Sequence, residues 1–233
     1  LEGQRYNLLM RSLMEALNCI KTRKSIREFK PDPVRRELLL EIFETAQRSP
    51  SYKNSQPWEV AIVSGKEKDE LSKVLIGLLE ENEASKPDIP EPTGWPPSIE
   101  ERIKTTLDKR GRLFGIDLTD PENVKRSKKA NFRFYGAPHV IFFYQDASLG
   151  EWSILDMGMF IQNVMLAANA KGLGTVPQAY LTDYSDEVRQ YLGIADSKRL
   201  ILGMSIGYAD RDDKINSGLT DREDLEKILR WIG

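Results

Sequence analysis

The sequence predicts one three-layer domain of mixed helices and strands over residues 1–233, of either the α/β or the α+β class. Three observations lead to this expectation. Some segments carry apolar residues at helical spacing, others form short β-rich runs, and long stretches separate the expected strands. With 40% hydrophobic residues, a chain of this length suffices for one packed core. Periodicity alone predicts no strand order.

Helices are expected where apolar residues recur three and four positions apart. Asp32 followed by Pro33 is typical of a helix start. The segment 153–171 is apolar almost all round, which indicates a buried helix, and Gly172 follows it where a helix-ending glycine belongs. The expected helices cover 8–21, 33–47, 66–81, 99–112, 153–171 and 221–231.

Strands are expected in three places. Residues 58–63 alternate between apolar and polar positions, and Gly65 ends the run. Residues 139–144 are almost continuously apolar, which is typical of the centre of a sheet. A third strand is expected over 200–206.

The segment 82–98 should be a long loop or lid. Its prolines exclude a long helix, and loops of this length are often functional. These prolines are Pro87, Pro90, Pro92, Pro96 and Pro97.

Composition excludes several classes of protein. The net charge of −2 does not suit a nucleic-acid binder, although residues 1–53 are locally basic, which suits a small anionic ligand. One cysteine excludes an internal disulfide and a Cys-rich zinc site, and one histidine excludes a three-His metal site, so no metal is expected. No apolar run could span a membrane and no leader pattern is visible, so a cytoplasmic location without membrane contact is expected.

The best candidate for a binding site is the segment 23–27. In an extended conformation, Arg23, Ser25 and Arg27 would lie on one face and could hold a phosphate. The alternative is a solvated basic turn.

Two further segments are candidates for contact with a flat heterocycle. Residues 51–58 place amides and hydroxyls before a strand, and residues 172–178 contain two glycines that would allow close approach of the backbone. The alternatives are an ordinary polar loop and a helix cap with a turn.

Several single residues have a simpler interpretation. His139, at the start of an apolar strand, is expected to be a satisfied structural histidine. Trp95, Arg110 and Arg112 could line a pocket but are expected to be lone surface groups.

Taken together, these segments resemble the FMN-dependent nitroreductase family over roughly residues 12–230, and the resemblance is greatest to the branch with members that reduce nitrobenzoates and nitroaromatics. The motifs are R-K-S-I-R-E-F at 23–29, P-D-P-V at 31–34, S-P-S-Y-K-N-S-Q-P-W-E-V at 49–60, F-Y-G-A-P-H-V at 134–140, L-D-M-G-M-F-I-Q-N-V-M-L-A-A at 155–168, G-L-G-T-V-P-Q at 172–178 and G-M-S-I-G-Y-A-D at 203–210. Asn216 and Arg222 also match.

The resemblance implies an α+β fold, a three-layer sandwich whose central, mainly antiparallel sheet is flanked by helices. It also implies a homodimer with FMN at the subunit interface and the 153–171 helix in the dimer core. The segment at about 82–135 would form a lid over the acceptor, with Trp95, Phe114 and Phe132 as candidates for stacking.

The resemblance also implies which residues bind FMN. The phosphate and the polar edge of the flavin would be held by Arg23, Lys24, Ser25, Arg27 and Arg222. The flavin would be reached from the other subunit by Pro50, Ser51, Tyr52 and Asn54. Its ring would lie against Val176, Pro177 and Gln178.

The activity implied is reduction of a small nitroaromatic or quinone-type acceptor by NADH or NADPH, through the flavin N5 and by a ping-pong mechanism. No side chain is assigned as acid or base, and a backbone amide from 177–179 would lie near N5. The alternatives are another flavin-dependent activity (dehalogenase, ene-type reductase or flavin processing) or a flavin-binding redox sensor with little turnover.

Overall fold

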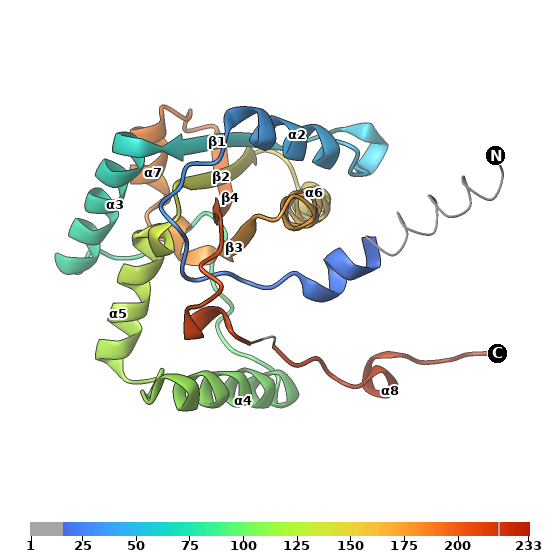
Figure 1. Cartoon of the computed structure of the whole chain (residues 1–233). Helices are drawn as coiled ribbons and strands as arrows, with labels where there is room; N and C mark the ends of the chain where they lie inside the picture. Colours follow the sequence, from blue (N-terminus) through green and yellow to red (C-terminus); the bar gives the residue numbers. More distant parts are fainter. Residues whose placement is uncertain (1–15, 219) are drawn as a thin grey trace.

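A four-stranded antiparallel sheet forms the centre of the molecule (Figure 1). The computed structural model describes residues 16–218 and 220–233. Helices cover both faces of the sheet, so the α+β class with a central antiparallel sheet is confirmed. In their order across the sheet, the strands are β1 (Glu59–Ser64), β2 (His139–Asp146), β4 (Lys198–Gly207) and β3 (Gly174–Gln178).

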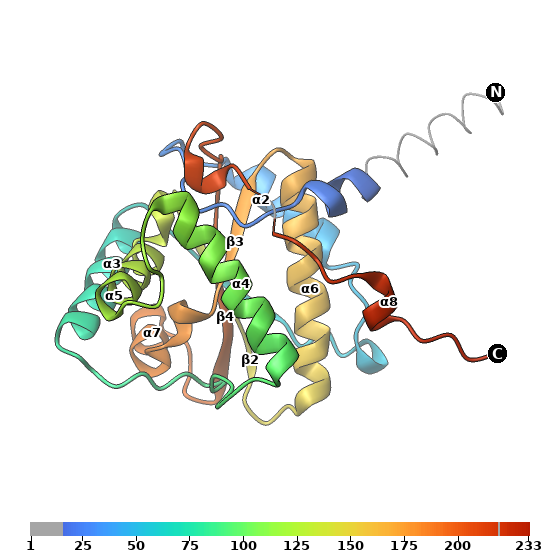
Figure 2. The ribbon, with the colours of Figure 1, turned by 90° about the horizontal axis from the view of Figure 1, so that it is seen from below.

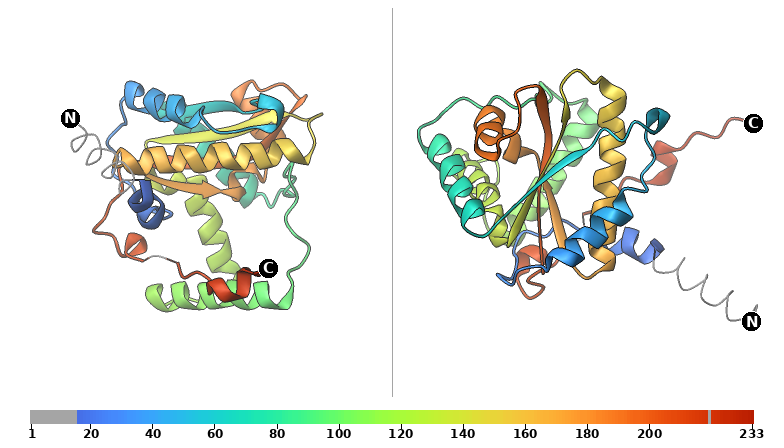
Figure 3. Two further views of the ribbon diagram at one scale, coloured as in Figure 1. Left: turned by 90° about the vertical axis from the view of Figure 1, so that its right-hand side faces the viewer. Right: turned by 90° about the horizontal axis from the view of Figure 1, so that it is seen from above.

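The helices form two outer layers, which Figures 2 and 3 show on opposite sides of the sheet. On one side lie α2 (Arg36–Ala46) and α6 (Glu151–Ala170). On the other side lie α3 (Gly65–Glu80), α5 (Pro121–Phe132) and α7 (Ser185–Leu192). Each layer buries its apolar stripe against one face of the sheet.

The apolar run of β2 explains this two-sided core. Successive side chains of a strand point to opposite faces. Ile141 and Phe143 therefore belong to the hydrophobic cluster under α2 and α6, while Val140 and Phe142 belong to the cluster under α3, α5 and α7. All four side chains are fully buried, as a central strand of a three-layer fold requires.

Two helices lie outside these layers. The helix α4 (Pro97–Phe114) lies apart from the sheet in Figures 1 and 3, and α8 (Leu225–Ile228) sits in a C-terminal segment that extends from the body. Within 16–218 and 220–233, no helix has the length and apolar character that crossing a membrane demands.

Most of the expected elements are confirmed within a few residues, including the three strands, the loop before α4 and the buried helix α6. The expected helix over 8–21 lies partly outside the described residues, and 16–22 are helical. Three elements were not expected. These are α5, α7 and β3, where 174–178 form an edge strand rather than a turn.

The expected helix over 221–231 is wrong, because only Leu225–Ile228 are helical. The apolar residues of this segment find no core in the single chain, and Trp231 is 90% exposed. A short helix without tertiary packing is not stable in water. The acidic side chains before it pair instead with α4, where Lys109 bonds Asp221.

Candidate functional site

The segment 23–27 lies extended beside the edge strand β3. Ile26 N–H donates to the Thr175 carbonyl at 3.0 Å, and Ser25 forms a parallel bridge with Thr175. Ile26 is buried against the sheet, whereas Arg23 and Arg27 are half-buried. The predicted alternation is therefore present, since side chains two positions apart share a face.

Gly174 allows this close approach. A Cβ on Gly174 would lie 2.6 Å from Ile26 Cγ1, which is closer than packed carbon atoms come. Gly172 instead adopts φ +79°, in the left-handed region, and ends α6 as a helix-capping glycine. In the single chain, both glycines therefore have a structural role: Gly174 permits close packing of the segment 23–27, and Gly172 ends α6.

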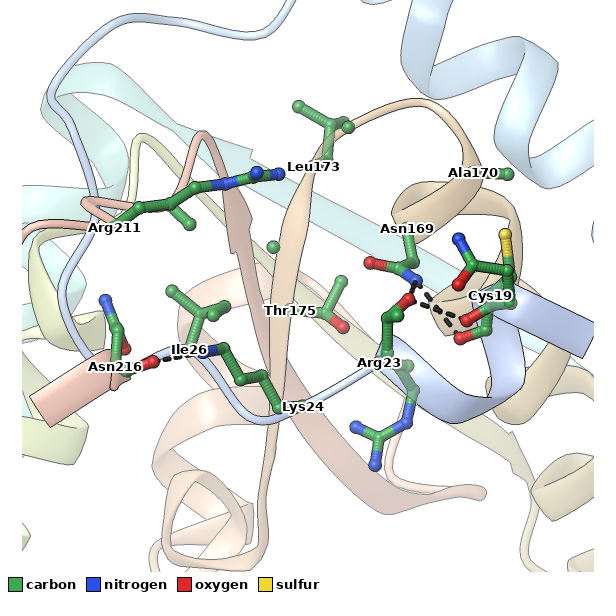
Figure 4. Close-up of a pocket in the computed structure, with 15 residues that line it drawn as sticks. Cys19, Arg23, Lys24, Ile26, Asn169, Ala170, Leu173, Thr175, Arg211 and Asn216 are labelled. Carbon is green, nitrogen blue, oxygen red and sulfur yellow. Dashed lines mark hydrogen bonds between the residues drawn. The ribbon is translucent and has the colours of Figure 1, made fainter. Parts of the chain in front are cut away.

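Asn216 ties the segment 23–27 to the turn that follows β4. Its Oδ1 accepts from Arg27 N–H at 2.8 Å, and its Nδ2 donates to the carbonyls of Glu28 and Asp210 at 2.8 and 2.7 Å. The Asn216 carbonyl accepts from Lys24 Nζ. Figure 4 shows Lys24 pointing toward Asn216, while the Arg23 guanidinium points elsewhere. The structure therefore gives Lys24 a backbone partner on the face opposite Arg23.

A cavity of about 700 Å³ opens between the segment 23–27 and the C-terminal end of α6 (Figure 4). Lys24, Asn169, Thr175 and Arg211 are among the residues that line it. Arg23 and Ile26 line it as well, whereas Ser25 and Arg27 do not.

Four arginines act on one another's charge in two pairs, Arg23 with Arg222 and Arg27 with Arg110, and we call these four the arginine cluster. Burial, and then the charge of Arg222, lower the pKa of Arg23. Burial, and then the charge of Arg27, lower the pKa of Arg110. Each pKa shift reports that the guanidinium is partly desolvated and faces another cation.

The arginine cluster has no acidic partner within 4.0 Å among residues 16–218 and 220–233. Arg222 donates to Thr220 Oγ1 at 2.7 Å and to nearby carbonyls. Desolvated like charges repel one another, and a bound anion removes that repulsion. The arrangement is therefore suited to bind anionic groups. Arg110, which was expected to be a lone surface group, is half-buried rather than fully exposed.

The polar loop 50–54 lies at the other end of α6. Tyr52 N–H donates to Asp156 Oδ2 at 3.0 Å, and the Tyr52 ring stacks on Trp152 with centroids 5.9 Å apart. Pro50 and Asn54 are exposed, and Ser51 Oγ accepts from the N–H of Gln56 at 3.0 Å.

This loop holds strained backbone. Lys53, Asn54 and Gln56 have φ values of 52°, 57° and 46°, in the left-handed region that non-glycine residues rarely adopt. Such strain is frequent at functional sites.

One chain does not bring the loop 50–54 to the segment 23–27. The loop contacts α6 at Asp156, whereas Asn169 Nδ2 donates to the Cys19 carbonyl just before that segment, at 3.1 Å. Thirteen helical residues separate these two contacts, which corresponds to about 20 Å along the axis. Tyr52 thus lies well away from the segment 23–27 along α6, whereas Pro50 lies nearer to it, in a hollow lined by Gln162 and Asn163.

The three residues of β3 that were predicted to contact the flavin ring differ in how accessible their side chains are to a ligand. The Gln178 amide is already used, since Nε2 donates to the Asn131 carbonyl at 3.1 Å and Oε1 accepts from Ser205 N–H at 3.1 Å. Val176 is buried in the cluster around Ile26. Pro177 is half-exposed, so it is the member of this group whose side chain is open to a ligand.

The structure decides two predictions, one for His139 and one for Phe132. His139 is a buried structural residue, as expected, and its Nε2 accepts from Val34 N–H at 3.0 Å. Phe132, expected to stack in the lid, is instead fully buried in the core beside Tyr184. Phe132 ends α5, whose apolar side faces the sheet, and this removes it from any lid surface. Trp95 is 49% exposed and Phe114 is half-buried.

Comparison with known proteins places the chain among nitroreductases. The family model described as the nitroreductase family matches residues 20–208. The 4-nitrobenzoate reductase of Pseudomonas putida is 32% identical over 218 residues, which cover 92% of this chain and 94% of that protein. The nitroreductase NfnB of Mycolicibacterium smegmatis is 33% identical over 213 residues, with coverages of 91% and 90%.

Solved structures agree with this placement. The crystal structure of the FMN-dependent NfnB from Mycobacterium smegmatis in complex with NADPH superposes with a TM-score of 0.89 at 32% identity, covering 95% of this chain and 99% of that one. The FMN and NADPH-dependent NfnB from sphigopyxis sp. strain HMH gives 0.88 at 30% identity, with coverages of 94% and 99%. The chain belongs to the nitroreductase family.

Proposed function

We propose that the protein is an FMN-dependent oxidoreductase that passes two electrons from NADPH or NADH to nitroaromatic or quinone-type acceptors by a ping-pong mechanism. The observation that carries this function is the set of cations on and around the extended segment 23–27, where Arg23 and Arg27 are half-buried and no arginine of the cluster has an acidic partner within 4.0 Å among the described residues. A phosphate monoester carries nearly two negative charges at neutral pH, which is enough to offset several of them. When bound, FMN would supply the redox chemistry, with the nicotinamide and the acceptor taking turns at one site.

The residues on the Arg23 face fit this cofactor. We propose that Arg23 and Arg222 hold the phosphate and that Ser25 and Arg27 contact the polar edge of the ring. Pro177 offers the ring an apolar surface at the edge of the sheet, and Val176 supports it from the core. The chain thereby binds and orients the cofactor with charge at one end and apolar contact at the other.

We also propose that the enzyme is a homodimer and that each FMN site takes residues from both copies. Tyr52 contacts α6 about 20 Å along the helix axis from the contact that precedes the segment 23–27, and this separation supports a loop supplied by a second copy. The open side of α6 is apolar, with Trp152 66% and Leu155 56% exposed beside a shallow hollow at Pro50. A two-fold interface along α6 would cover this surface and bring Pro50, Ser51, Tyr52 and Asn54 to the partner's flavin.

Within the domain that spans 1–233, we propose that the region 82–135 forms the lid over the acceptor. The helix α4 supports this role, because it lies apart from the sheet and is joined to the C-terminal segment by the pairs of Lys109 with Asp221 and of Arg102 with Glu223. The relatives named for nitroarene reduction favour this activity over dehalogenation, ene reduction, flavin processing or redox sensing.

Anaerobic half-reactions test the proposed function. The purified protein should show a bound flavin, and mass spectrometry of the released cofactor should identify FMN. NADPH or NADH should bleach the flavin, and 4-nitrobenzoate or nitrobenzene should reoxidise it over repeated cycles. Protein without flavin, or flavin that no nitroarene reoxidises, would contradict the function.

A further inference from the structure

The side chain of Gln178, the last residue of β3, points into the protein. It is 2% exposed, and its amide makes four hydrogen bonds. Oε1 accepts from the N–H of Ser205 at 3.1 Å and from the Ser205 hydroxyl at 2.5 Å. Nε2 donates to the carbonyl and to Oδ1 of Asn131, at 3.1 and 3.2 Å. A primary amide has two donors and two acceptor sites, so Gln178 has none left for a ligand. We call Gln178, Asn131 and Ser205 the Gln178 network.

The Gln178 network joins three elements that are far apart in the sequence. Asn131 lies in the last turn of α5, Ser205 lies in the inner strand β4, and both are buried. The Asn131 side chain is itself held, because its Nδ2 donates to the Ser127 carbonyl at 2.9 Å. Removing one member leaves buried polar atoms without a partner, which costs more than the bond itself contributes. The network therefore fixes the end of β3 against both a neighbouring strand and a helix.

This end of β3 carries Pro177, the side chain that is open to a ligand. Successive residues of a strand point to opposite faces, so burial of Gln178 on one face keeps Pro177 half-exposed on the other. The bonds from the segment 23–27 reach β3 at Thr175, three residues before Gln178. Directly after Gln178 the chain leaves the sheet for a short 3-10 helix, Ala179–Thr182. Strand ends fray where few bonds hold them, and here the Gln178 network supplies those bonds.

We propose that Asn131 and Ser205 are positioning residues for the flavin ring, which act by holding Gln178 and with it the backbone of 177–179. This inference rests on the proposed function and adds Asn131, which lies outside every motif of the family resemblance. Gln178 then supports the surface that the ring contacts and does not touch the ring through its side chain. The network acts on the ring end of the site and the arginine cluster on the phosphate end, so their contributions to FMN affinity are separable.

Titration of the flavin-free protein with FMN and with riboflavin, which has the same ring without the phosphate, separates the two ends. Gln178→Met and Asn131→Leu should each weaken both ligands by the same factor, about 10-fold, so the ratio of the two affinities stays that of the wild type. Ser205→Ala, which removes one of the four bonds, should weaken both by a smaller factor. Gln190→Met is the matched control, because Gln190 is exposed on α7, and it should change neither affinity.

Two further measurements test the route through Gln178. Because Asn131 acts through Gln178, the double variant should lose no more affinity than Gln178→Met alone, whereas independent contributions would multiply. At saturating FMN, the visible circular dichroism of the bound flavin should change in Gln178→Met and in Asn131→Leu, because the ring rests on a displaced surface. A loss of stability alone would leave this spectrum unchanged.

The thermal midpoint of each variant shows whether it is folded, and Ser205→Ala carries the comparison if Gln178→Met does not fold. Unchanged riboflavin affinity in the folded variants would overturn the inference. A loss confined to FMN would overturn it as well, because the network would then act on the phosphate. A loss in Gln178→Met with none in Asn131→Leu and Ser205→Ala would mean that Gln178 itself touches the ring, which also overturns it. Failure of the proposed function is distinguishable, because the wild-type protein would then bind neither flavin, or no nitroarene would reoxidise its reduced flavin.

Discussion

Some residues of the site already use their polar groups in hydrogen bonds within the chain, and others keep these groups available to a ligand. Strand alternation places Arg23, Ser25 and Arg27 together from sequence alone. Sequence could not show that the Gln178 amide is used, because its partners Asn131 and Ser205 are 47 and 27 residues away. Contacts of this kind are set by the fold rather than by local pattern.

The partial burial of Arg110 was missed for the same reason. Its position on a charged helix is typical of a solvated side chain, and nothing in the local sequence predicts that the fold covers it. The placement of α4 decides its surroundings. By contrast, His139 could be interpreted correctly, since a lone histidine at the start of an apolar strand has to be buried and satisfied.

We expect His139 to make stability depend on pH. Burial lowers the pKa of His139, and Nε2 must stay unprotonated to accept from Val34 N–H. The unfolded chain binds a proton near the ordinary pKa of about 6.5, whereas the folded chain binds it only at lower pH. The free energy of unfolding should therefore fall as the pH drops below about 6.5.

Because the chain has one histidine, its NMR signal can be followed without assignment. The signal should titrate below pH 6.5. His139→Phe should lower the free energy of unfolding by about 1–3 kcal/mol, since Val34 N–H loses its acceptor. In this variant the stability should no longer change between pH 5.5 and 7, and an unchanged slope would count against this role.

Among the elements, those that sequence predicts best have strong apolar patterns. The all-round apolar α6 and the continuous run of β2 were identified because a two-sided core needs them. The helix α5 was missed because only a few apolar residues interrupt its charges, although Asp120 caps it and Pro121 begins it. The helix expected over 221–231 fails for the opposite reason, because its apolar pattern has no core to pack against in the single chain.

The pairing of the segment 23–27 with β3 depends on one glycine. Gly174→Ala should place a methyl group against Ile26, lower the stability by about 1–3 kcal/mol and weaken FMN binding by displacing Arg23 and Arg27. Differential scanning calorimetry and FMN titration measure the two effects.

Gly77→Ala is the matched control, because Gly77 lies inside α3 with nothing within 4 Å of an added Cβ. It should raise stability by about 0.5–1 kcal/mol and leave FMN binding unchanged. Equal behaviour of the two variants would mean that the contact with Ile26 does not position the segment. A second change, Ile26→Ala, should recover part of the FMN affinity lost in Gly174→Ala.

For the whole molecule, α6 sets the distance between Tyr52 and the segment 23–27, and this distance is the main support for a shared site. Sequence could identify both parts of the site through the family resemblance. Their separation follows only from the fold, because it is a property of the single chain in three dimensions.

Mixed dimers test whether the site is shared. Arg23→Ala damages one group of residues, and Ser51→Ala with Asn54→Ala damages the other. Each altered protein alone should bind FMN weakly. When the two are unfolded and refolded together in equal amounts, about a quarter of the sites should be intact, because half of the dimers are mixed and each mixed dimer has one complete site.

Recovery of flavin binding near that fraction supports the shared site, whereas refolding without recovery would indicate a site contained in one chain. Light scattering at micromolar concentration should show twice the mass of the chain in every sample. A stable monomer that retains flavin would contradict the homodimer.

The central claim, that the arginine cluster holds a phosphate, is tested most directly by calorimetric titration of the flavin-free protein with FMN and with riboflavin, which lacks the phosphate. The wild type should bind FMN at least about 100-fold more tightly. In Arg23→Ala combined with Arg222→Ala, the two affinities should converge, while Lys21→Ala, an exposed cation nearby, should preserve the difference. Equal affinities of the wild type for the two ligands would contradict the account.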